Sequence, residues 1–256
     1  MSITLSILAS GSKANAILIC EDKTRILIDA GLGIRLMTAA LGEVSVRLGD
    51  LSAVLITHEH TDHVRGLAKL LERSKAPIYA SAQTLTAVDY MLPARVRATA
   101  MNGESLEIGS FAVHGIPVPH DASGPLAYHL QSGGHRITVA TDLGEVPSEL
   151  SPVLAKSNTL VFESNHDEQM LIGGSYPEFL KERILSEYGH LSNRQCAAAL
   201  SACKGNGLKT VVLAHLSDEN NRPELARASA EKALEDSGAE LYVTTRTASG
   251  PFLNLS

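Results

Sequence analysis

The strongest constraint on the fold of this chain is the segment 58–63, which reads HEHTDH and directly follows the apolar run 53–56. A short continuous apolar run is typical of a strand that is buried on both faces of a sheet. Residues 64–74 then carry apolar side chains at helical spacing, and 77–80 resemble a further strand. The segment 58–63 is therefore expected in a loop beyond the carboxyl end of a buried strand, where sites in layered α/β folds commonly lie.

Three imidazoles and a carboxylate within this short segment are ligand types for Zn²⁺, Mn²⁺ and iron. His58 and His60 lie two positions apart at a strand end, so both can converge on one ion. Asp62 and His63 follow on the turn and can face a second ion. One ion needs three or four protein ligands, so others must come from elsewhere in the chain. Further apolar runs also end in a ligand-type residue, and these residues are His120, Asp142 and His215.

The composition allows a sizeable hydrophobic core and excludes a globally basic surface for nucleic acid. The 256 residues are 44% hydrophobic and 20% charged, with a formal net charge of -6. A nucleic-acid substrate stays possible in principle, because a site with two metal ions supplies its own positive charge. The three cysteines lack CxxC spacing and fit buried positions in a reducing cytosol. The chain also lacks a basic leader and an apolar run near the ~20 residues that span a bilayer, so we expect a cytoplasmic protein without a membrane partner.

Short strands separated by turns dominate the N-terminal half, and helices become frequent later. The expected strands are 3–8, 16–20, 25–29, 53–57, 77–80, 111–116, 127–130, 136–140, 159–162, 210–214 and 240–245. Gly133 and Gly134 predict a hairpin turn. Residues 192–195 (SNRQ) have the form of a capping box that opens a helix, and 223–237 predict another helix with Pro near its start. Because no repeat or linker interrupts the pattern, we expect a single domain over 1–256 with two β-rich halves.

In order and spacing, the ligand-type residues resemble the metallo-β-lactamase fold of metallohydrolases. The resemblance implies an α/β fold, a four-layer αββα sandwich with two mixed β-sheets flanked by helices. It implies two divalent metal ions, Zn²⁺ or Mn²⁺, with a metal-bridging hydroxide as nucleophile. It implies one ion held by His58, His60 and His120, the other by Asp62, His63 and His215, and Asp142 as the bridge between them. Asp29, in the segment LIDAG, matches an early Asp that orders the ligand loop by hydrogen bonds.

Two residues outside the ligand set resemble parts of phosphodiesterase sites. His190 matches a non-ligand His that lies beside the metals in ribonuclease Z and in the cyclic phosphodiesterase of phosphonate metabolism. Such an imidazole can contact phosphate or protonate a leaving oxygen. Glu163 matches a carboxylate that would hold His190 in a relay toward Asp62. We therefore expect catalytic roles for Asp62, Glu163 and His190, with a helix-capping His190 and a solvated Glu163 as the structural alternatives.

The loop 10–15 (SGSKAN) joins the first two expected strands. Its small residues let backbone N–H groups approach an anion and Lys13 adds a charge, although a simple hairpin loop has a similar composition. We predict substrate binding by this loop and by the segment after His190, through Ser10, Ser12, Lys13, Asn15, Ser192 and Asn193. His166 is left open as a loop cap or a substrate contact.

Four stretches are similar to the YycJ (WalJ)-like subgroup and extend the resemblance over essentially the whole chain. They are 8–12 (LASGS), 163–167 (ESNHD), 189–193 (GHLSN) and 214–221 (AHLSDENN). Members are regarded as 5′→3′ DNA exonucleases, with proposed roles in mismatch repair or cell-wall regulation. The absence of a long insertion between Asp142 and His215 argues against a β-CASP domain. The reading SKAN at 12–15, where relatives often have SSGN, leaves substrate detail open.

The resemblance implies a dinuclear metal-dependent phosphodiesterase, a 5′→3′ exonuclease with DNA as its partner, and leaves a homodimer open. A small-molecule cyclic phosphodiesterase of the phosphoribosyl cyclic phosphate type is the main alternative, slightly favoured by the acidic net charge. A metal-bound regulatory protein without activity is a third reading. The complete ligand set with His190 argues against it, because a structural site needs no open coordination position. A thioesterase or lactonase would leave Glu163 and His190 without a role.

Overall fold

The chain divides into two compact units, which we call unit 1 and unit 2. The computed structural model describes residues 2–101, 103–205, 207–245 and 250–255. Unit 1 comprises 1–115, 122–126 and 246–256, and unit 2 comprises 116–121 and 127–245. The expectation of a single domain over 1–256 stays a prediction.

Unit 1 is built on a sheet whose inner strands are almost entirely apolar, as the sequence predicts. Its antiparallel strands are β1 (Ile3–Ala9), β2 (Ala16–Glu21), β3 (Thr24–Ile28) and β14 (Phe252–Leu255). Its parallel strands, which continue from β3, are β4 (Ala53–Leu55), β5 (Ile78–Ala80) and β6 (Ala98–Ala100). A hairpin of β7 (Leu106–Ile108) and β8 (Phe111–Pro117) follows, and it turns at Gly109 with a φ of 60°.

The helices of unit 1 place their apolar sides against this sheet. They are α1 (Ile34–Glu43), α2 (Thr61–Val64), α3 (Leu67–Arg73) and α4 (Ala82–Val88), with 3₁₀ turns η1 (Leu48–Asp50) and η2 (Asp89–Met91). Met37 and Leu41 of α1 and Leu70 of α3 join Val54 of β4 in one buried cluster. Burial of such side chains, at about 1.5–3 kcal/mol each, is the main stabilising contribution to this unit.

Unit 2 is built on strands that become parallel after one hairpin. They are β9 (Leu126–Ser132), β10 (His135–Ala140), β11 (Thr159–Glu163), β12 (Thr210–Ala214) and β13 (Glu240–Val243). Strands β9 and β10 pair through the predicted turn at Gly133-Gly134, and β10 to β13 pair in parallel. The helices are α5 (Ser151–Lys156), α6 (Glu168–Gly173), α7 (Glu178–Leu185), α8 (Asn193–Ala202) and α9 (Pro223–Leu234).

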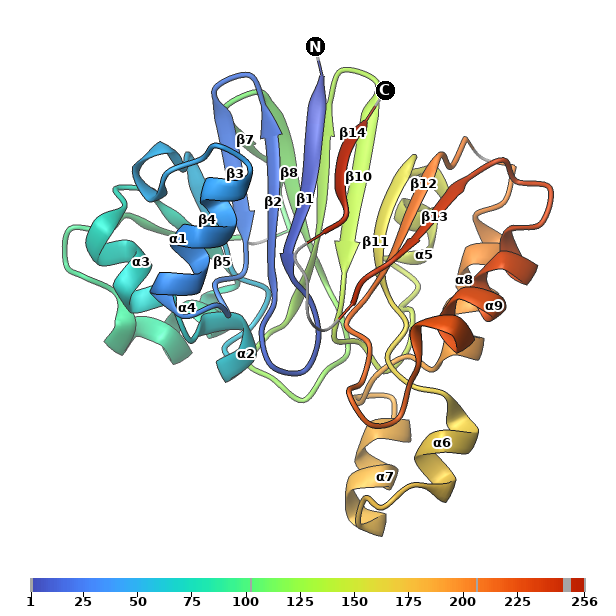
Figure 1. The fold of residues 1–256 in the computed structure, drawn as a ribbon. Helices are drawn as coiled ribbons and strands as arrows, with labels where there is room; N and C mark the ends of the chain where they lie inside the picture. Colours follow the sequence, from blue (N-terminus) through green and yellow to red (C-terminus); the bar gives the residue numbers. More distant parts are fainter. Residues whose placement is uncertain (1, 102, 206, 246–249, 256) are drawn as a thin grey trace. The chain divides into compact units, whose positions relative to one another are not determined.

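The strands form two mixed sheets of seven, and helices flank both. The orders are β14-β1-β2-β3-β4-β5-β6 and β13-β12-β11-β10-β9-β8-β7. In unit 2, α8 and α9 lie beside β12 and β13 (Figure 1). These two sheets with flanking helices confirm the predicted fold class.

Several element boundaries differ from the sequence prediction for local reasons. The helix expected over 64–74 is two helices, because α2 begins at Thr61 and Gly66 interrupts the path before α3. The strand expected over 53–57 ends at Leu55, since Thr57 turns toward Asp29. The capping box is confirmed, with Ser192 at the N-cap of α8.

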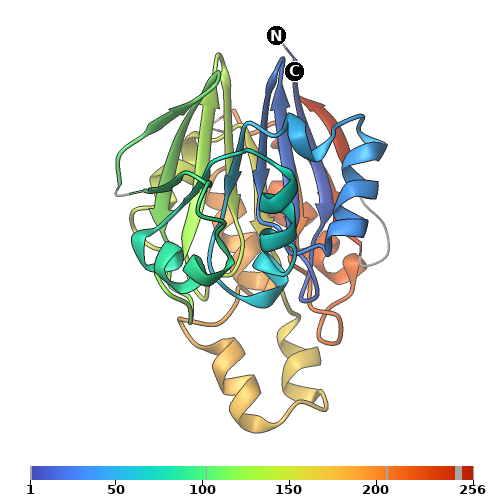
Figure 2. The same ribbon diagram turned by 90° about the vertical axis from the view of Figure 1, so that its left-hand side faces the viewer.

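Helices α6 and α7 project from the strands of unit 2 as a pair (Figures 1 and 2). They are inserted between the end of β11 and the start of α8. No residue of α7 is buried, and Phe179 is 71% exposed. The pair therefore extends from the two segments that carry Glu163 and His190.

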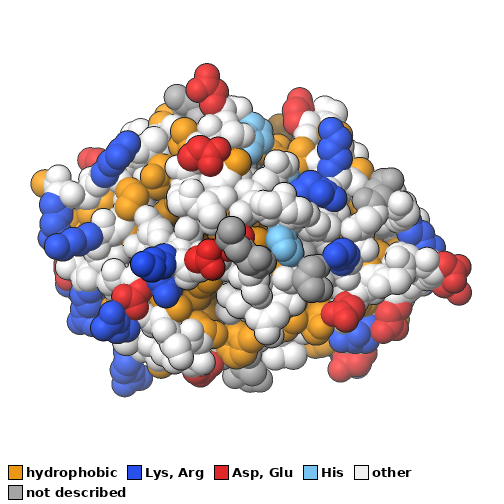
Figure 3. Space-filling model, turned by 90° about the horizontal axis from the view of Figure 1, so that it is seen from above, with side chains coloured by type: hydrophobic (Ala, Val, Ile, Leu, Met, Phe, Trp, Pro, Cys, Tyr) orange, Lys and Arg blue, Asp and Glu red, His pale blue; other side chains and the backbone are white. Residues whose placement is uncertain are grey.

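Charged side chains of both signs are interspersed on the face shown in Figure 3. This agrees with the moderate net charge of -6. Within the described residues, none of the helices combines the length and the apolar character needed to cross a bilayer.

Candidate metal centre

In unit 1, the carboxylate of Asp29 orders the loop that carries the segment 58–63. Its Oδ1 accepts the backbone N–H of Thr57 at 2.9 Å, and its Oδ2 lies 2.8 Å from Nδ1 of His63. The Thr57 hydroxyl lies 2.9 Å from the same Oδ2 and 3.0 Å from Nδ1 of His58. Engaging Nδ1 directs Nε2 of each ring toward a metal, as outer carboxylates do for ligating imidazoles. The expected hydrogen bonds between Asp29 and the ligand loop are confirmed.

The ligand-type side chains of segment 58–63 lie together in unit 1. The ring centroid of His58 lies 4.5 Å from that of His60 and 4.1 Å from that of His63. Nε2 of His63 lies 3.3 Å from Oδ2 of Asp62. His58 and His63 are buried, whereas His60 and Asp62 are half-buried.

Asn15 contacts this cluster from the loop between β1 and β2. Its Nδ2 lies 3.1 Å from Oδ2 of Asp62 and 3.0 Å from Nε2 of His63. Its backbone N–H also donates to the carbonyl of Asp62 at 2.8 Å. Asn15 is buried, Ser10 is half-buried, and Ser12 and Lys13 are exposed. The predicted substrate loop therefore has an inner residue that holds the ligand loop and outer residues at the surface.

Three residues at strand ends adopt left-handed backbone conformations. Asp29, Asp142 and His215 have φ values of 61°, 59° and 55°. They follow β3, β10 and β12. Non-glycine residues with positive φ are uncommon and cost about 1–3 kcal/mol each, and they cluster at functional sites. The chain thus turns sharply where the sequence places these two ligand candidates and the ordering carboxylate.

In unit 2, His120, Asp142 and His215 lie together. Oδ1 of Asp142 lies 3.9 Å from Nε2 of His120 and 3.5 Å from Nε2 of His215. Nδ1 of His120 lies 3.0 Å from the carbonyl of Gly189. Burial lowers the pKa of His120 below its ordinary value. The negative charge of Asp142 raises this pKa, but the effect of burial is larger. The His120 ring is thereby held neutral, which is the form that binds a metal.

Glu163 lies at the end of β11 with its carboxylate fully buried. Oε1 lies 2.9 Å from Nδ1 of His190 and 2.8 Å from Nδ1 of His215. Oε2 accepts the backbone N–H groups of Leu143 and Leu191, each at 3.1 Å. Burial would raise the pKa of Glu163, but the charge and hydrogen bond of His190 and the hydrogen bond of His215 hold it at about 2. The structure contradicts the alternative of a solvated Glu163.

His190 lies beside the ligand candidates of unit 2 and keeps some exposure to solvent. Its side chain is 20% exposed, and its ring centroid lies 5.1 Å from that of His120 and 5.3 Å from that of His215. Ser192 is the N-cap of α8 and accepts the N–H of Gln195. The alternative of a helix-capping His190 is therefore wrong.

His166 is buried at 1% exposure, and neither of its ring nitrogens has a hydrogen-bond partner. Burial lowers the pKa of His166 to about 4. The nearby charge of Glu163 raises this pKa, but its effect is smaller than that of burial. The cap of α6 is instead Asp167, which accepts the N–H of Met170 at 2.9 Å. Of the two readings left open for His166, the loop cap is excluded.

The donor set fits divalent transition metals. Each of four imidazoles has Nδ1 within hydrogen-bonding distance of an oxygen, and these are His58, His63, His120 and His215. That arrangement fixes the tautomer in which Nε2 carries the lone pair. In unit 2, Asp142, Glu163, His190 and His215 offer ligand-type atoms within 4.8 Å of one another. Neutral imidazoles and carboxylates of this kind suit Zn²⁺ and Mn²⁺ alike.

The structure adds residues that the sequence did not single out. Thr57 connects Asp29 to the ligand loop, and Asn165 and Asn221 hold the segments around His215. Ser192 and Asn193, which we predicted to bind substrate, are 1% and 4% exposed and take part in hydrogen bonds within unit 2. The sequence signal for Asn165 and Asn221 was their place in the stretches 163–167 and 214–221. Their hydrogen-bond partners could not be predicted, because these are distant in sequence and depend on the fold.

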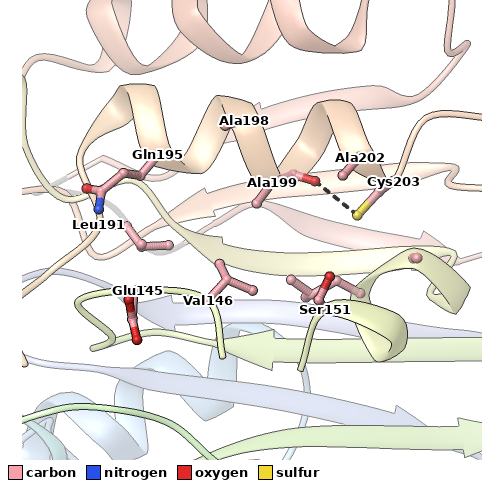
Figure 4. Close-up of a pocket in the computed structure, with 11 residues that line it drawn as sticks. Glu145, Val146, Ser151, Leu191, Gln195, Ala198, Ala199, Ala202 and Cys203 are labelled. Carbon is pink, nitrogen blue, oxygen red and sulfur yellow. Dashed lines mark hydrogen bonds between the residues drawn. The ribbon is translucent and has the colours of Figure 1, made fainter. Parts of the chain in front are cut away.

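A pocket of about 350 Å³ lies between α5 and α8 in unit 2 (Figure 4). Its wall is mainly apolar and includes Leu191, Ala199 and Cys203. Gln195 lies at one end of it and donates to the carbonyl of Gly144 at 3.3 Å. The pocket thus borders the backbone that follows Asp142 and His190.

Comparison with known sequences supports one enzyme family. A family model described as a beta-lactamase superfamily domain matches residues 24–216. The exodeoxyribonuclease YycJ of Bacillus anthracis is 36% identical over 241 residues, covering 93% of this chain and 91% of that protein. The exodeoxyribonuclease WalJ of Streptococcus pneumoniae serotype 2 (strain D39) is 36% identical over 226 residues, covering 86% of this chain and 84% of that protein.

Solved structures show the same fold at lower identity. The metallo-beta-lactamase fold protein YhfI from Bacillus subtilis matches with a TM-score of 0.78 at 16% identity, covering 99% of this chain and 100% of that one. Zn²⁺-bound PqqB from Methylobacterium extorquens matches with a TM-score of 0.75 at 20% identity, covering 98% and 100%. At such identities the likeness concerns the fold alone.

Proposed function

Because this chain belongs to the beta-lactamase superfamily, and within it to the group of YycJ and WalJ, we propose that it is a 5′→3′ exodeoxyribonuclease. The chain is a metal-dependent hydrolase, as its family and its exonuclease relatives indicate. The observation that carries the proposal is 36% identity to an exodeoxyribonuclease over 93% of the chain. We further propose that the protein acts in the cytoplasm on DNA, either alone or as a homodimer.

The proposed metal site has two divalent ions, Zn²⁺ or Mn²⁺. The ligands are those implied by the family pattern: His58, His60 and His120 for one ion, Asp62, His63 and His215 for the other, and Asp142 for both. When bound, such ions lower the pKa of water and offset the negative charge of a reacting phosphoryl group. The fixed Nδ1 partners of the imidazoles support this assignment.

In the proposed mechanism, His190 gives a proton to the leaving oxygen of the cleaved phosphodiester. Its Nδ1 lies 2.9 Å from Oε1 of Glu163, so Nε2 is the ring nitrogen that can transfer the proton. The Glu163 carboxylate holds the ring in place through this hydrogen bond. A catalytic role for Asp62 is part of the same proposal.

Substrate binding is proposed for the outer part of loop 10–15. Ser12 and Lys13 are exposed, and the Lys13 ammonium can attract a DNA phosphate that flanks the cleaved bond. Asn15, Ser192 and Asn193 are buried, so any role in substrate binding would act through the residues they hold.

The test is hydrolysis of DNA by metal-loaded protein. Duplex and single-stranded DNA would be offered with phosphorothioate linkages at the 5′ end, at the 3′ end or at neither, with Mn²⁺, Zn²⁺ or Mg²⁺. We expect release of mononucleotides that a blocked 5′ end prevents and a blocked 3′ end does not. Hydrolysis of a five-membered cyclic phosphate ester without DNA cleavage would contradict the proposal and indicate a cyclic phosphodiesterase instead.

A further inference from the structure

Three loop segments of unit 2 each carry one member of the group around Glu163. The segment 163–167 begins at the last residue of β11 and carries Glu163. The segment 189–193 runs into the start of α8 and carries His190, and 215–221 follows β12 and carries His215. Oε1 of Glu163 reaches both imidazoles only if these three segments keep their relative positions.

Asn221 and Asn193 form a reciprocal pair of amide hydrogen bonds between two of these segments. Nδ2 of Asn221 donates to Oδ1 of Asn193, and Nδ2 of Asn193 donates to Oδ1 of Asn221, each at 2.9 Å. The hydroxyl of Ser164 donates to Oδ1 of Asn193 at 2.7 Å, which brings in the third segment. The two amides thereby connect all three segments through side chains alone.

The second N–H of Asn221 reaches the backbone behind Glu163. Nδ2 lies 2.8 Å from the carbonyl oxygen of Ser164 and 2.9 Å from that of Asn165, so the two carbonyls share one donor. Oδ1 of Asn221 also accepts the N–H of Arg222 at 2.9 Å. Every polar atom of the Asn221 side chain is therefore used.

Asn165 carries the connection to His215. Its Nδ2 donates to the carbonyl of His215 at 2.9 Å, and its backbone carbonyl accepts the N–H of Ser217 at 2.7 Å. These bonds hold the two peptides that follow the left-handed His215, whose φ is 55°. A strained residue keeps such a conformation only when its surroundings fix it.

Because the three asparagines are buried, their hydrogen bonds largely determine the relative positions of the three segments. Asn165, Asn193 and Asn221 are 4%, 4% and 3% exposed. Water has little access to such positions, so losing the Asn221 donor would cost the carbonyls of Ser164 and Asn165 a hydrogen bond each, although Asn165 keeps the one from Ser217. The three segments would then shift relative to one another.

We propose that Asn221, through its amide pair with Asn193, is a positioning residue that sets the distances from Glu163 to His190 and His215. The catalytic consequence rests on the proposed function, whereas the geometric consequence does not. Asn221→Asp removes the donor shared by Ser164 and Asn165 and places a carboxylate oxygen against their carbonyls. Asn193→Asp is the milder variant, because it removes only the donor to Asn221 and keeps both acceptor roles.

Asn158 offers a matched control at the opposite end of β11. It is 7% exposed, donates from Nδ2 to the carbonyl of Gly134 at 2.8 Å and accepts the N–H of Arg136 at 2.9 Å. Asn158→Asp therefore removes a buried amide donor of the same kind without touching the three segments.

The first measurement is the ¹⁵N and ¹H imidazole spectrum of the full-length protein without metal. We expect the ring signals of His190 and His215 to shift in Asn221→Asp and, less, in Asn193→Asp, and to stay in place in Asn158→Asp. Unshifted signals in folded Asn221→Asp would overturn the proposal. The proposal would also be overturned if Asn158→Asp shifted the His190 and His215 signals as much as Asn221→Asp does, at a similar loss of Tm. If Asn221→Asp does not fold, Asn193→Asp decides by the same criteria.

The second measurement is DNA hydrolysis by the metal-loaded variants. We expect kcat of Asn221→Asp to fall about 100-fold with KM little changed, since a displacement near 1 Å at a reacting group costs that much. Asn158→Asp should retain kcat. An unchanged kcat in Asn221→Asp would overturn the positioning role. If wild-type protein does not cleave DNA, the proposed function fails, and the imidazole spectra still test the geometry.

Discussion

In each unit, a carboxylate lies within hydrogen-bonding distance of Nδ1 of a histidine that is a candidate metal ligand. Oδ2 of Asp29 lies 2.8 Å from Nδ1 of His63, and Oε1 of Glu163 lies 2.8 Å from Nδ1 of His215. Such a partner fixes the tautomer and raises the basicity of the ligand nitrogen. At the scale of single residues, we therefore predict that metal affinity depends on groups outside the proposed ligand set, namely Asp29 and Glu163.

Asp29→Asn tests this dependence in unit 1. The amide can still accept the N–H of Thr57, but an N–H in place of Oδ2 would face the N–H of His63. We expect metal affinity to fall about 10–100-fold, as measured by competition with a chromophoric chelator. Asp50→Asn, which removes only a surface partner of Arg47, is the control and should bind metal as the wild type does. Equal affinities of the two variants would contradict the role of Asp29.

His166 predicts a pH dependence of stability. Burial lowers its pKa from the ordinary 6.5 to about 4, so the unfolded chain takes up a proton before the folded protein does. The contribution of His166 to folding stability should therefore be lost as the pH drops from about 6.5 to about 4, and this contribution should stay constant below that range. In His166→Gln the free energy of unfolding, measured in urea across this range, should fall less steeply. An identical slope in both proteins would show that the ring is not held neutral.

Residues with strong local patterns were predictable from sequence, and residues defined by long-range contacts were not. The density of ligand types in 58–63 and the strand-end positions of His120, Asp142 and His215 are local features. The roles of Thr57 and Asn221 depend on carbonyls and carboxylates far away in sequence. No spacing rule identifies such partners before the strands are paired.

At the scale of elements, strand ends and helix caps place the side chains of the candidate site. Helix α8 begins with a complete capping box of Ser192 and Gln195, two residues after His190. The Ser192 hydroxyl also donates to Glu168 at the start of α6. The start of α8 is therefore fixed on two sides, and with it the backbone N–H of Leu191 that binds Glu163.

Ser192→Ala should destabilise the protein by about 1 kcal/mol, the usual contribution of an N-cap hydroxyl. The free energy of unfolding from urea titration measures this effect. Ser201→Ala is the control, since Ser201 is exposed in the same helix. A loss in Ser192→Ala no larger than that in Ser201→Ala would mean that the cap contributes nothing.

Long apolar runs and explicit turn residues made most strands predictable, because they follow elementary periodicity. The predicted hairpin at Gly133-Gly134 is confirmed by the pairing of Ser132 with His135. Other elements gave weaker signals. Helix α1 begins after Gly33 without a side-chain cap, and α7 has no buried residue that would mark an apolar face. Strand β14 depends on pairing with β1, which is distant in sequence.

At the scale of the whole molecule, sequence and fold together indicate a metallohydrolase of the beta-lactamase superfamily. The proposed ligands come from segments spread between 58 and 215, and each segment follows a strand. The net charge of -6 means that a DNA substrate must be held mainly by local cations and by the metals, so its binding should weaken with salt. In the proposed mechanism, hydrolysis of a phosphodiester depends on His190 and its partner Glu163.

The most direct test of the central claim is therefore His190→Ala, with DNA hydrolysis and bound metal measured on the same preparation. We expect kcat to fall about 10²–10⁴-fold, the usual contribution of general acid catalysis, while the metal content stays at the wild-type level. Loss of metal together with activity would make His190 a ligand. Unchanged turnover would show that the leaving oxygen departs without it, and either result would contradict the account.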